Sequence, residues 1–232
     1  MFLPCYQAMT SAEFHRCADL PENMAWMACH FSSSDEGLSN LPVALPEGSL
    51  IIVDDWIPIN GHDPTVIEKQ LRQLILQTSC AGILLDFQRE SVDETAFLCK
   101  HLTVQLPFPI AITEDYAKDL DCAVFLSSPA PHVSLETHIK PWANREIWLE
   151  LATDPQHAII TEEGTQITSY LFDKLPEPQH KDNKCHCHYH WYFLNDTVHF
   201  YLQRTKEDII ELQQEAASLG VRFGVGLYQQ LK

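Results

Sequence analysis

The segment GILLDFQ places a carboxyl and a carboxamide two residues apart, at Asp86 and Gln88. On a β-strand, side chains at i and i+2 share one face, so these two polar groups would point the same way. A carboxyl can accept hydrogen bonds or move a proton, whereas an amide can bind a ligand but cannot deliver a proton. The pair predicts a binding pocket; the alternative is that Asp86 only caps the turn after the strand.

A second polar cluster follows the run LIIV, where Asp54 and Asp55 precede Trp56. Adjacent residues on a strand face opposite ways, so only one of the two carboxyls can enter a pocket. Trp56 could stack on the apolar face of a sugar ring, because an indole offers a large flat surface. The alternative for Trp56 is an aromatic side chain packed under a loop.

Further carboxyls close two other apolar runs, Glu114 with Asp115 after PIAIT and Glu150 in EIWLEL. If two of these groups converge with Asp86, they could form an acid–base pair. For glycosidase chemistry the two carboxyls of such a pair stand about 5–9.5 Å apart. Asp86, Glu114 and Glu150 are therefore the candidate catalytic residues.

The segment KCHCHYHW alternates His186, His188 and His190 with other residues, so the three imidazoles would share one strand face. Histidines at this spacing can chelate zinc or nickel, with His199 on a paired strand as a further ligand. The alternative is an exposed hairpin with histidines on its wet side. No other cofactor is indicated, because the sequence has no glycine-rich phosphate loop.

These polar groups share a position at the ends of short, continuously apolar runs, which are typical of strands buried on both faces. Functional groups at the carboxyl ends of such strands are what a parallel α/β barrel requires. Eight runs show the pattern: FLPCYQ, MAWMACHF, LIIVDDW, GILLDFQ, PIAITED, CAVFLSS, EIWLEL and FGVGLYQ. The sequence therefore predicts a compact, partly degenerate (β/α)8 TIM barrel, formed as a single domain by residues 1–232.

Three segments between the strands have helical periodicity with capping residues. The first is 63–78, with Asp63 as N-cap and Pro64 as first helical residue. The second is 91–102, where Ser91 and Glu94 fit a capping box. The third is 205–219, where Thr205 and Asp208 are similarly placed and Gly220 is the C-cap. Residues 129–145 show no convincing helix, which makes the barrel degenerate.

Residues 154–197 interrupt the alternation with short β segments and a hairpin turning at Asn195 and Asp196. The pattern predicts an antiparallel β insertion before the last βα unit.

The composition limits the classes of partner. The formal charge is −17, from 32 acidic and 15 basic residues, so the surface would repel nucleic acid. No run approaches the length of a membrane span, and the N-terminus lacks the basic region of a signal peptide. Eight scattered cysteines indicate reduced thiols. We therefore expect a cytoplasmic protein, or a secreted one with a removed leader, whose partner is neutral or cationic; its oligomeric state stays open.

The order of these motifs resembles the chitinase-like barrels of glycoside hydrolase family 18. AGILLDFQ, residues 81–88, is similar to the fourth-strand signature D-G-x-x-x-D-x-E, in which Gly82 and Asp86 match. Ala81 and Gln88 replace the first Asp and the catalytic Glu. SLIIVDDW resembles the third strand, and FLPCYQ, with Tyr6, the first. FGVGLYQ resembles the eighth, with Tyr228 in the place of a pocket-closing Trp.

The resemblance implies a sugar site formed by Tyr6, Asp54, Asp55, Trp56, Gln88 and Tyr228. It also implies that the family's general acid is absent, because Gln88 cannot protonate a glycosidic oxygen. The first hypothesis is a barrel that binds a saccharide or another neutral small molecule with absent or weak glycosidase activity. The second hypothesis is an active hydrolase with relocated carboxylates. The third is a metal-dependent enzyme or metal-binding protein that uses the histidine strip, formed by His186, His188 and His190.

Overall fold

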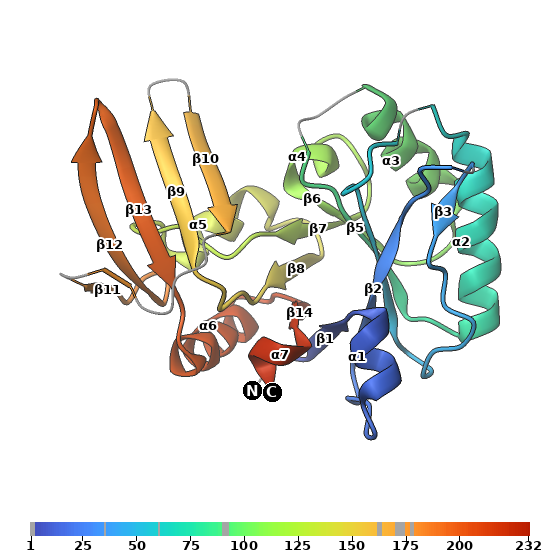
Figure 1. Ribbon diagram of the computed structural model, residues 1–232, viewed down its shortest axis with the longest axis horizontal. Coiled ribbons are helices and arrows are strands. Elements are labelled where there is room, and N and C mark those ends of the chain that lie inside the picture. Colours follow the sequence, from blue (N-terminus) through green and yellow to red (C-terminus); the bar gives the residue numbers. More distant parts are fainter. Residues whose placement is uncertain are drawn as a thin grey trace.

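The computed structural model describes residues 3–34, 36–59, 61–89, 93–161, 164–169 (backbone only), 175–176 and 179–232. An eight-stranded parallel barrel forms the right half of Figure 1, and an antiparallel sheet stands beside it on the left. None of the described helices is long and apolar enough to cross a membrane.

The barrel contains all eight predicted strands. They are β1 (Cys5–Met9), β2 (Met24–Phe31), β4 (Leu50–Asp54), β5 (Gly82–Asp86), β6 (Ile110–Thr113), β7 (Ala123–Leu126), β8 (Ile147–Glu150) and β14 (Phe223–Leu227). Neighbours pair in parallel in the order β1-β14-β8-β7-β6-β5-β4-β2, and β1 also pairs with β2, which closes the barrel. A short strand, β3 (Leu38–Ser39), adds an antiparallel edge to β2. The predicted TIM-barrel fold is confirmed.

The helices outside the barrel are uneven in length. They are α1 (Ser11–Arg16), α2 (Pro64–Thr78), α3 (Asp93–Gln105), α4 (Glu114–Ala117), α5 (Leu135–Ile139) with the 3-10 turn η1 (Lys140–Trp142), α6 (Lys206–Ser218) and α7 (Tyr228–Leu231). A loop and β3 replace the helix between β2 and β4. Only α2, α3 and α6 exceed two turns, and these are the three helices that the sequence predicts.

The N-termini of α2 and α6 confirm the expected capping. Asp63 accepts a hydrogen bond from the Thr65 N–H, and Pro64 begins α2. Thr205 and Asp208 form a reciprocal capping box on α6, and Gly220 follows that helix with a φ of +84°. The capping residue expected for α3, Ser91, lies outside the described residues.

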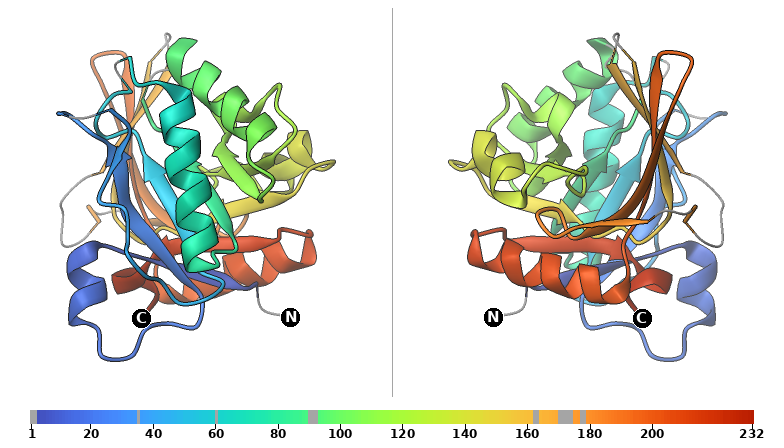
Figure 2. Two further views of the ribbon diagram at one scale, coloured as in Figure 1. Left: turned by 90° about the vertical axis from the view of Figure 1, so that its right-hand side faces the viewer. Right: turned by 90° about the vertical axis from the view of Figure 1, so that its left-hand side faces the viewer.

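The predicted insertion is a five-stranded antiparallel sheet, seen nearly edge-on in Figure 2. Its strands are β9 (Gln156–Thr161), β10 (Gly164–Ser169), β11 (His180–Asp182), β12 (Cys187–Leu194) and β13 (Thr197–Gln203), in the order β10-β9-β13-β12-β11. Asn195 and Asp196 both have positive φ in the β12–β13 turn, as a two-residue hairpin requires. The sheet extends to Gln203, beyond the expected end at residue 197.

Two apolar layers hold the barrel together. Inward-facing side chains such as Leu50, Leu84 and Trp148 fill the lumen, and a larger cluster packs the outer strand faces against the helices. Side chains therefore fill the lumen below the carboxyl ends of the strands, and any ligand must bind above this packing, at the strand ends.

Candidate functional site at the barrel mouth

A cavity of about 190 Å³ opens where β4, β5, β8 and β14 end. Its polar lining comes from six side chains: Asp54, Asp86, Glu150, Asp154, Gln156 and Gln230. Its apolar lining includes Ala8, Met27, Ile52, Leu84, Phe125, Val225 and Leu227. The carboxyl ends of parallel strands thus gather polar groups from distant parts of the sequence over an apolar floor.

Asp54 and Asp86 are direct neighbours in this cavity. They are paired residues at the last position of the adjacent strands β4 and β5. Paired positions on neighbouring strands lie about 5 Å apart with side chains on the same face. Ile52 and Leu84, two residues earlier, line the cavity below them. Leu84 and Asp86 therefore share one face of β5, as alternation along a strand requires.

Burial and crowding of like charges raise the carboxyl pKa values. Burial, helped by the charges of Glu150, Asp54 and Asp55, raises the pKa of Asp86 from 3.8 to about 6. A hydrogen bond of 2.8 Å from the Gln88 amide to Asp86 Oδ1 partly offsets this rise. Burial also raises the pKa of Asp54. A carboxyl with such a pKa can hold a proton at mildly acidic pH.

Glu150 reaches the cavity from β8, the seventh barrel strand. The Ser128 N–H donates to its Oε2 at 3.1 Å, and the Ser128 hydroxyl donates to its backbone carbonyl at 2.8 Å. Burial raises the pKa of Glu150 despite the nearby charge of Arg204. Asp86 and Glu150 are thus two protonatable groups in one cavity.

Asp55 faces away from the cavity and fixes the loop after β5. It is buried, and its two carboxylate oxygens accept from the Gln88 N–H at 2.9 Å and the Arg89 N–H at 3.0 Å. The Arg89 guanidinium returns to the backbone carbonyls of Asp55 and Trp56. Only Asp54 of the acidic pair enters the cavity, as the strand geometry predicts, and Asp55 instead positions Gln88.

The structure does not bring Tyr6 or Tyr228 to the mouth, where the sequence expected them. Tyr6 is the second residue of β1, which continues to Met9, so its side chain is buried in the lower barrel and its hydroxyl donates to the Gly48 carbonyl. Tyr228 begins α7, and its hydroxyl contacts the Cys17 thiol at 3.3 Å. It lines a separate surface hollow.

Trp56 and Glu114 also lie outside the cavity lining. Trp56 is 76% exposed and its ring meets His30 edge-to-face, with 6.3 Å between centroids. Glu114 is the first residue of α4, so the strand β6 ends before it. Its neighbour Asp115 is directed to solvent, 4.0 Å from the Lys118 ammonium.

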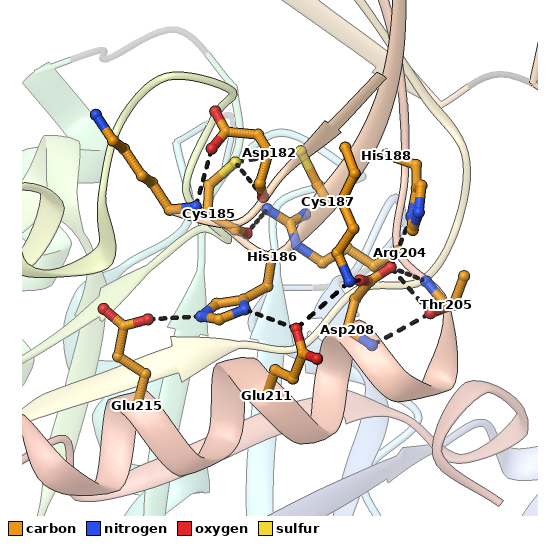
Figure 3. A network of polar contacts seen from close by, with 12 residues as sticks. Asp182, Cys185, His186, Cys187, His188, Arg204, Thr205, Asp208, Glu211 and Glu215 are labelled. Atoms are coloured by element: carbon orange, nitrogen blue, oxygen red, sulfur yellow. Dashed lines mark hydrogen bonds and ion pairs between the residues drawn. The ribbon is translucent and has the colours of Figure 1, made fainter. Parts of the chain in front are cut away.

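The histidine strip pairs with acidic residues of α6 rather than forming a ligand set (Figure 3). His186 lies between Glu211 and Glu215, with N···O distances of 3.2 and 2.5 Å. His188 Nδ1 lies 2.9 Å from Asp208. His190 instead packs against tyrosine rings on the sheet. Within the described part of the chain, no group of three or more His, Cys, Asp or Glu side chains is placed to hold a metal ion.

Three polar residues of the lining were missed by the sequence analysis: Asp154, Gln156 and Gln230. Gln230 also accepts a hydrogen bond from the Thr153 N–H at 2.9 Å, which ties the C-terminal α7 to the loop after β8. The polar pair Gln229–Gln230 directly after the last apolar run was the available signal. Asp154 lies in the irregular connection after β8, which has no periodicity to read, and Gln156 is the first residue of β9.

No family model matches the sequence, and no curated protein matches it. Solved structures do match. An N-acetylglucosaminidase of glycoside hydrolase family 18 from Paenibacillus barengoltzii superposes with a TM-score of 0.62 at 9% identity, covering 99% of this chain and 97% of that one.

Two further structures are similar. A family 18 chitinase double mutant from Cycas revoluta in complex with (GlcNAc)4 gives a TM-score of 0.57 at 10% identity, covering 98% and 95% of the two chains. The spore cortex-lytic enzyme SleL of Bacillus cereus gives 0.56 at 10% identity, covering 99% and 71%. At these identities the similarity shows the fold alone, a TIM barrel similar to those of the family 18 glycoside hydrolases.

Proposed function

We propose that the protein binds a saccharide at the barrel mouth and has absent or weak glycosidase activity. The observation that carries the proposal is the cavity itself, in which carboxyl and amide groups stand over an apolar floor at the strand ends. Sugars need this combination, because their hydroxyls require directed polar partners and their ring faces require apolar contact. Similar barrels from Cycas revoluta contain (GlcNAc)3 or (GlcNAc)4.

Weak or absent catalysis is proposed from the chemistry of Gln88. Its amide donates to Asp86 Oδ1 and has no proton to give to a leaving group. Loss of a general acid reduces a rate by about 10²–10⁴-fold. Binding does not require that acid, and one substitution in the (GlcNAc)4-bound Cycas revoluta mutant is itself Glu to Gln.

The test of binding is a thermal-shift titration with a tetramer of N-acetylglucosamine. At about 100 times its dissociation constant, a ligand stabilises the folded protein by about 2.7 kcal/mol, which a melting curve resolves. The shift should disappear in Asp86→Ala and persist in Asp115→Ala, whose carboxyl is exposed. No shift with any saccharide in a folded wild-type protein would refute the proposal.

The test of the lost acid is Gln88→Glu. If Gln88 occupies the position of the acid, the variant should gain measurable cleavage of an N-acetylglucosamine oligomer. The release of reducing ends measures this cleavage. Gln88→Ala is the matched control, because it removes the amide without adding an acid. A folded Gln88→Glu variant that binds the oligomer but gains no cleavage would contradict this assignment.

A second candidate, an active hydrolase, is favoured by the shared cavity of Asp86 and Glu150. Both have raised pKa values, and a raised pKa is what a carboxyl needs to act as general acid. This candidate predicts turnover by the wild-type protein, at least 100-fold lower in both Asp86→Asn and Glu150→Gln, with a bell-shaped pH profile. Absence of wild-type turnover on bound oligomers excludes it.

A further inference from the structure

The barrel-mouth cavity is lined by carboxyl groups whose negative charge a neutral sugar would leave without a counter-charge. Four carboxyl side chains line it: Asp54, Asp86, Glu150 and Asp154. Among the described residues, the lining contains no lysine, arginine or histidine. A ligand in this cavity therefore meets carboxyl oxygens on its polar side, and the amides of Gln156 and Gln230 are the neutral side-chain donors of the described lining.

Two arginines near the cavity donate their hydrogen bonds to backbone carbonyls. Arg204, whose charge acts on Glu150, donates to the carbonyls of Pro129 and Cys185. Arg89 donates to the carbonyls of Asp55 and Trp56. In the described part of the chain, no ion pair is formed by any of the four carboxyls that line the cavity.

One basic group faces Asp54 from the neighbouring strand. His30, on β2, lowers the pKa of Asp54, but burial outweighs it and the pKa is raised overall. The His30 ring is itself within hydrogen-bond distance of the Asn40 side chain at 3.3 Å. It is absent from the cavity lining, so it does not supply the missing cation there.

The size and walls of the cavity limit the ligand further. At about 190 Å³ it is smaller than a typical drug-sized pocket, so it fits one sugar unit rather than a chain. Met27, Phe125 and Leu227 contribute apolar surface to the cavity lining. An anionic sugar is excluded, because its charge would be added to four negative groups.

We propose that the mouth cavity selects an amino sugar with a free, protonated nitrogen, as in glucosamine units of a deacetylated oligosaccharide, over the N-acetylated sugar. This inference rests on the proposed saccharide function and names the class of sugar. An ammonium group offers three donors and a positive charge to the surrounding carboxylates. An acetamide is neutral, has one donor, and presents a carbonyl acceptor to a cavity already rich in acceptors.

The selection has a characteristic pH dependence. Burial and the charges of Glu150, Asp54 and Asp55 hold the pKa of Asp86 at about 6, so raising the pH through this value creates the anion that binds the ammonium. Asp154 faces Glu150 from the loop after β8 and opposes its ionisation in the same way. A sugar amine loses its proton near the range of an α-amino group, at about pH 8. Affinity should therefore pass through a maximum between these values.

The experiment is calorimetric titration of the protein with a glucosamine tetramer and with an N-acetylglucosamine tetramer at about pH 7. Charge-assisted hydrogen bonds should make the glucosamine tetramer bind roughly 10- to 100-fold more tightly. Only the glucosamine tetramer should lose affinity at both lower and higher pH. Equal or tighter binding of the acetylated tetramer would overturn this inference and leave the saccharide function intact. Binding of neither tetramer would overturn both.

Two variants locate the preference in the cavity. Asp154→Asn removes one charge at the exposed rim, and Glu150→Gln removes one inside while keeping an oxygen for the Ser128 N–H. Each should weaken binding of the glucosamine tetramer several-fold more than binding of the acetylated one. Asp115→Asn, an exposed acid outside the cavity, should leave both affinities unchanged. An unchanged preference in both cavity variants would contradict the inference.

Discussion

Single carboxyl groups in this protein perform different tasks according to their surroundings. Asp86 faces other acids in the cavity, and burial raises its pKa to about 6. Asp55, directly after β4, is buried, but its carboxylate accepts hydrogen bonds from two backbone N–H groups of the loop after β5. The first arrangement costs stability at neutral pH and prepares a site, whereas the second stabilises the loop that holds Gln88.

Replacing Asp86 by Asn should stabilise the protein in a pH-dependent way. Because the folded-state pKa lies above the ordinary 3.8, the folded protein binds this proton more tightly than the unfolded chain. Raising the pH from about 4 through about 6 therefore destabilises the wild type through this group. Asn removes the penalty, so the gain should be absent near pH 4 and reach up to about 2 kcal/mol near pH 7.5. Urea unfolding at both pH values measures it; the same change at both would contradict the assignment.

Replacing Asp55 by Ala should destabilise the protein by roughly 2–3 kcal/mol, because two buried N–H groups lose their acceptors. It should also weaken saccharide binding, since the backbone of Gln88 is no longer held. Asp55→Asn keeps one acceptor oxygen and should fall between the wild type and Asp55→Ala. Equilibrium unfolding reports the first effect and the thermal-shift titration the second. A loss below about 0.5 kcal/mol would show that water replaces the carboxylate.

At the scale of elements, local signals in the sequence were sufficient for capped helices and buried strands. The N-cap at Asp63 and the capping box at Thr205 depend only on residues a few positions apart, so they could be predicted. The same holds for the hairpin at Asn195 and Asp196. Asp86, Asp54 and Glu150 follow from their positions at strand ends, because strand ends converge in any parallel barrel.

The errors in the candidate site come from geometry that no local signal encodes. The sequence does not show how deep in the barrel the Tyr6 side chain lies. It also does not show that α7 directs Tyr228 toward Cys17. His186 precedes β12 and has a φ of +48°, so the predicted alternation along one strand applies within β12 to His188 and His190. The partners of His186 and His188 are residues of α6, far along the chain, and tertiary contact alone reveals them.

The contact between the insertion and α6 depends on Asp208, which is fully buried at the start of that helix. It accepts from Thr205 and lies 3.2 Å from the Lys181 ammonium and 2.9 Å from His188. Burial opposes ionisation, but the hydrogen bonds from Thr205 and Lys181 outweigh it, so the pKa of Asp208 is lowered. Asp208 thus both caps α6 and attaches the antiparallel sheet to this helix.

Replacing Asp208 by Ala should therefore cost roughly 2–4 kcal/mol of unfolding free energy, more than a helix cap alone. Because the folded-state pKa is lowered, this contribution is present above about pH 4 and is lost as the pH falls through the folded-state value. Glu207→Ala is the control, since its carboxyl is exposed in the same helical turn and should change stability by less than about 0.5 kcal/mol. Similar losses in both variants would argue against the network.

At the scale of the whole molecule, the fold brings both ends of the sequence to one cavity, from Ala8 on β1 to Gln230 on α7. The whole chain carries a formal charge of −17. Such a charge repels polyanions and raises the local concentration of cationic ligands. The same charge destabilises the compact state by self-repulsion, which gives it a measurable consequence apart from any ligand.

Added salt should therefore stabilise the protein. At about 0.1 M ionic strength the Debye length is about 10 Å, which is short compared with the molecule, so repulsion between distant acids is screened. We expect the melting temperature to rise by a few degrees between about 0.01 and 0.2 M sodium chloride. Glu22→Lys with Glu47→Lys, both at exposed positions, changes the charge from −17 to −13 and should reduce the rise. A salt-independent melting temperature would mean that local ion pairs, rather than net charge, govern the electrostatic stability.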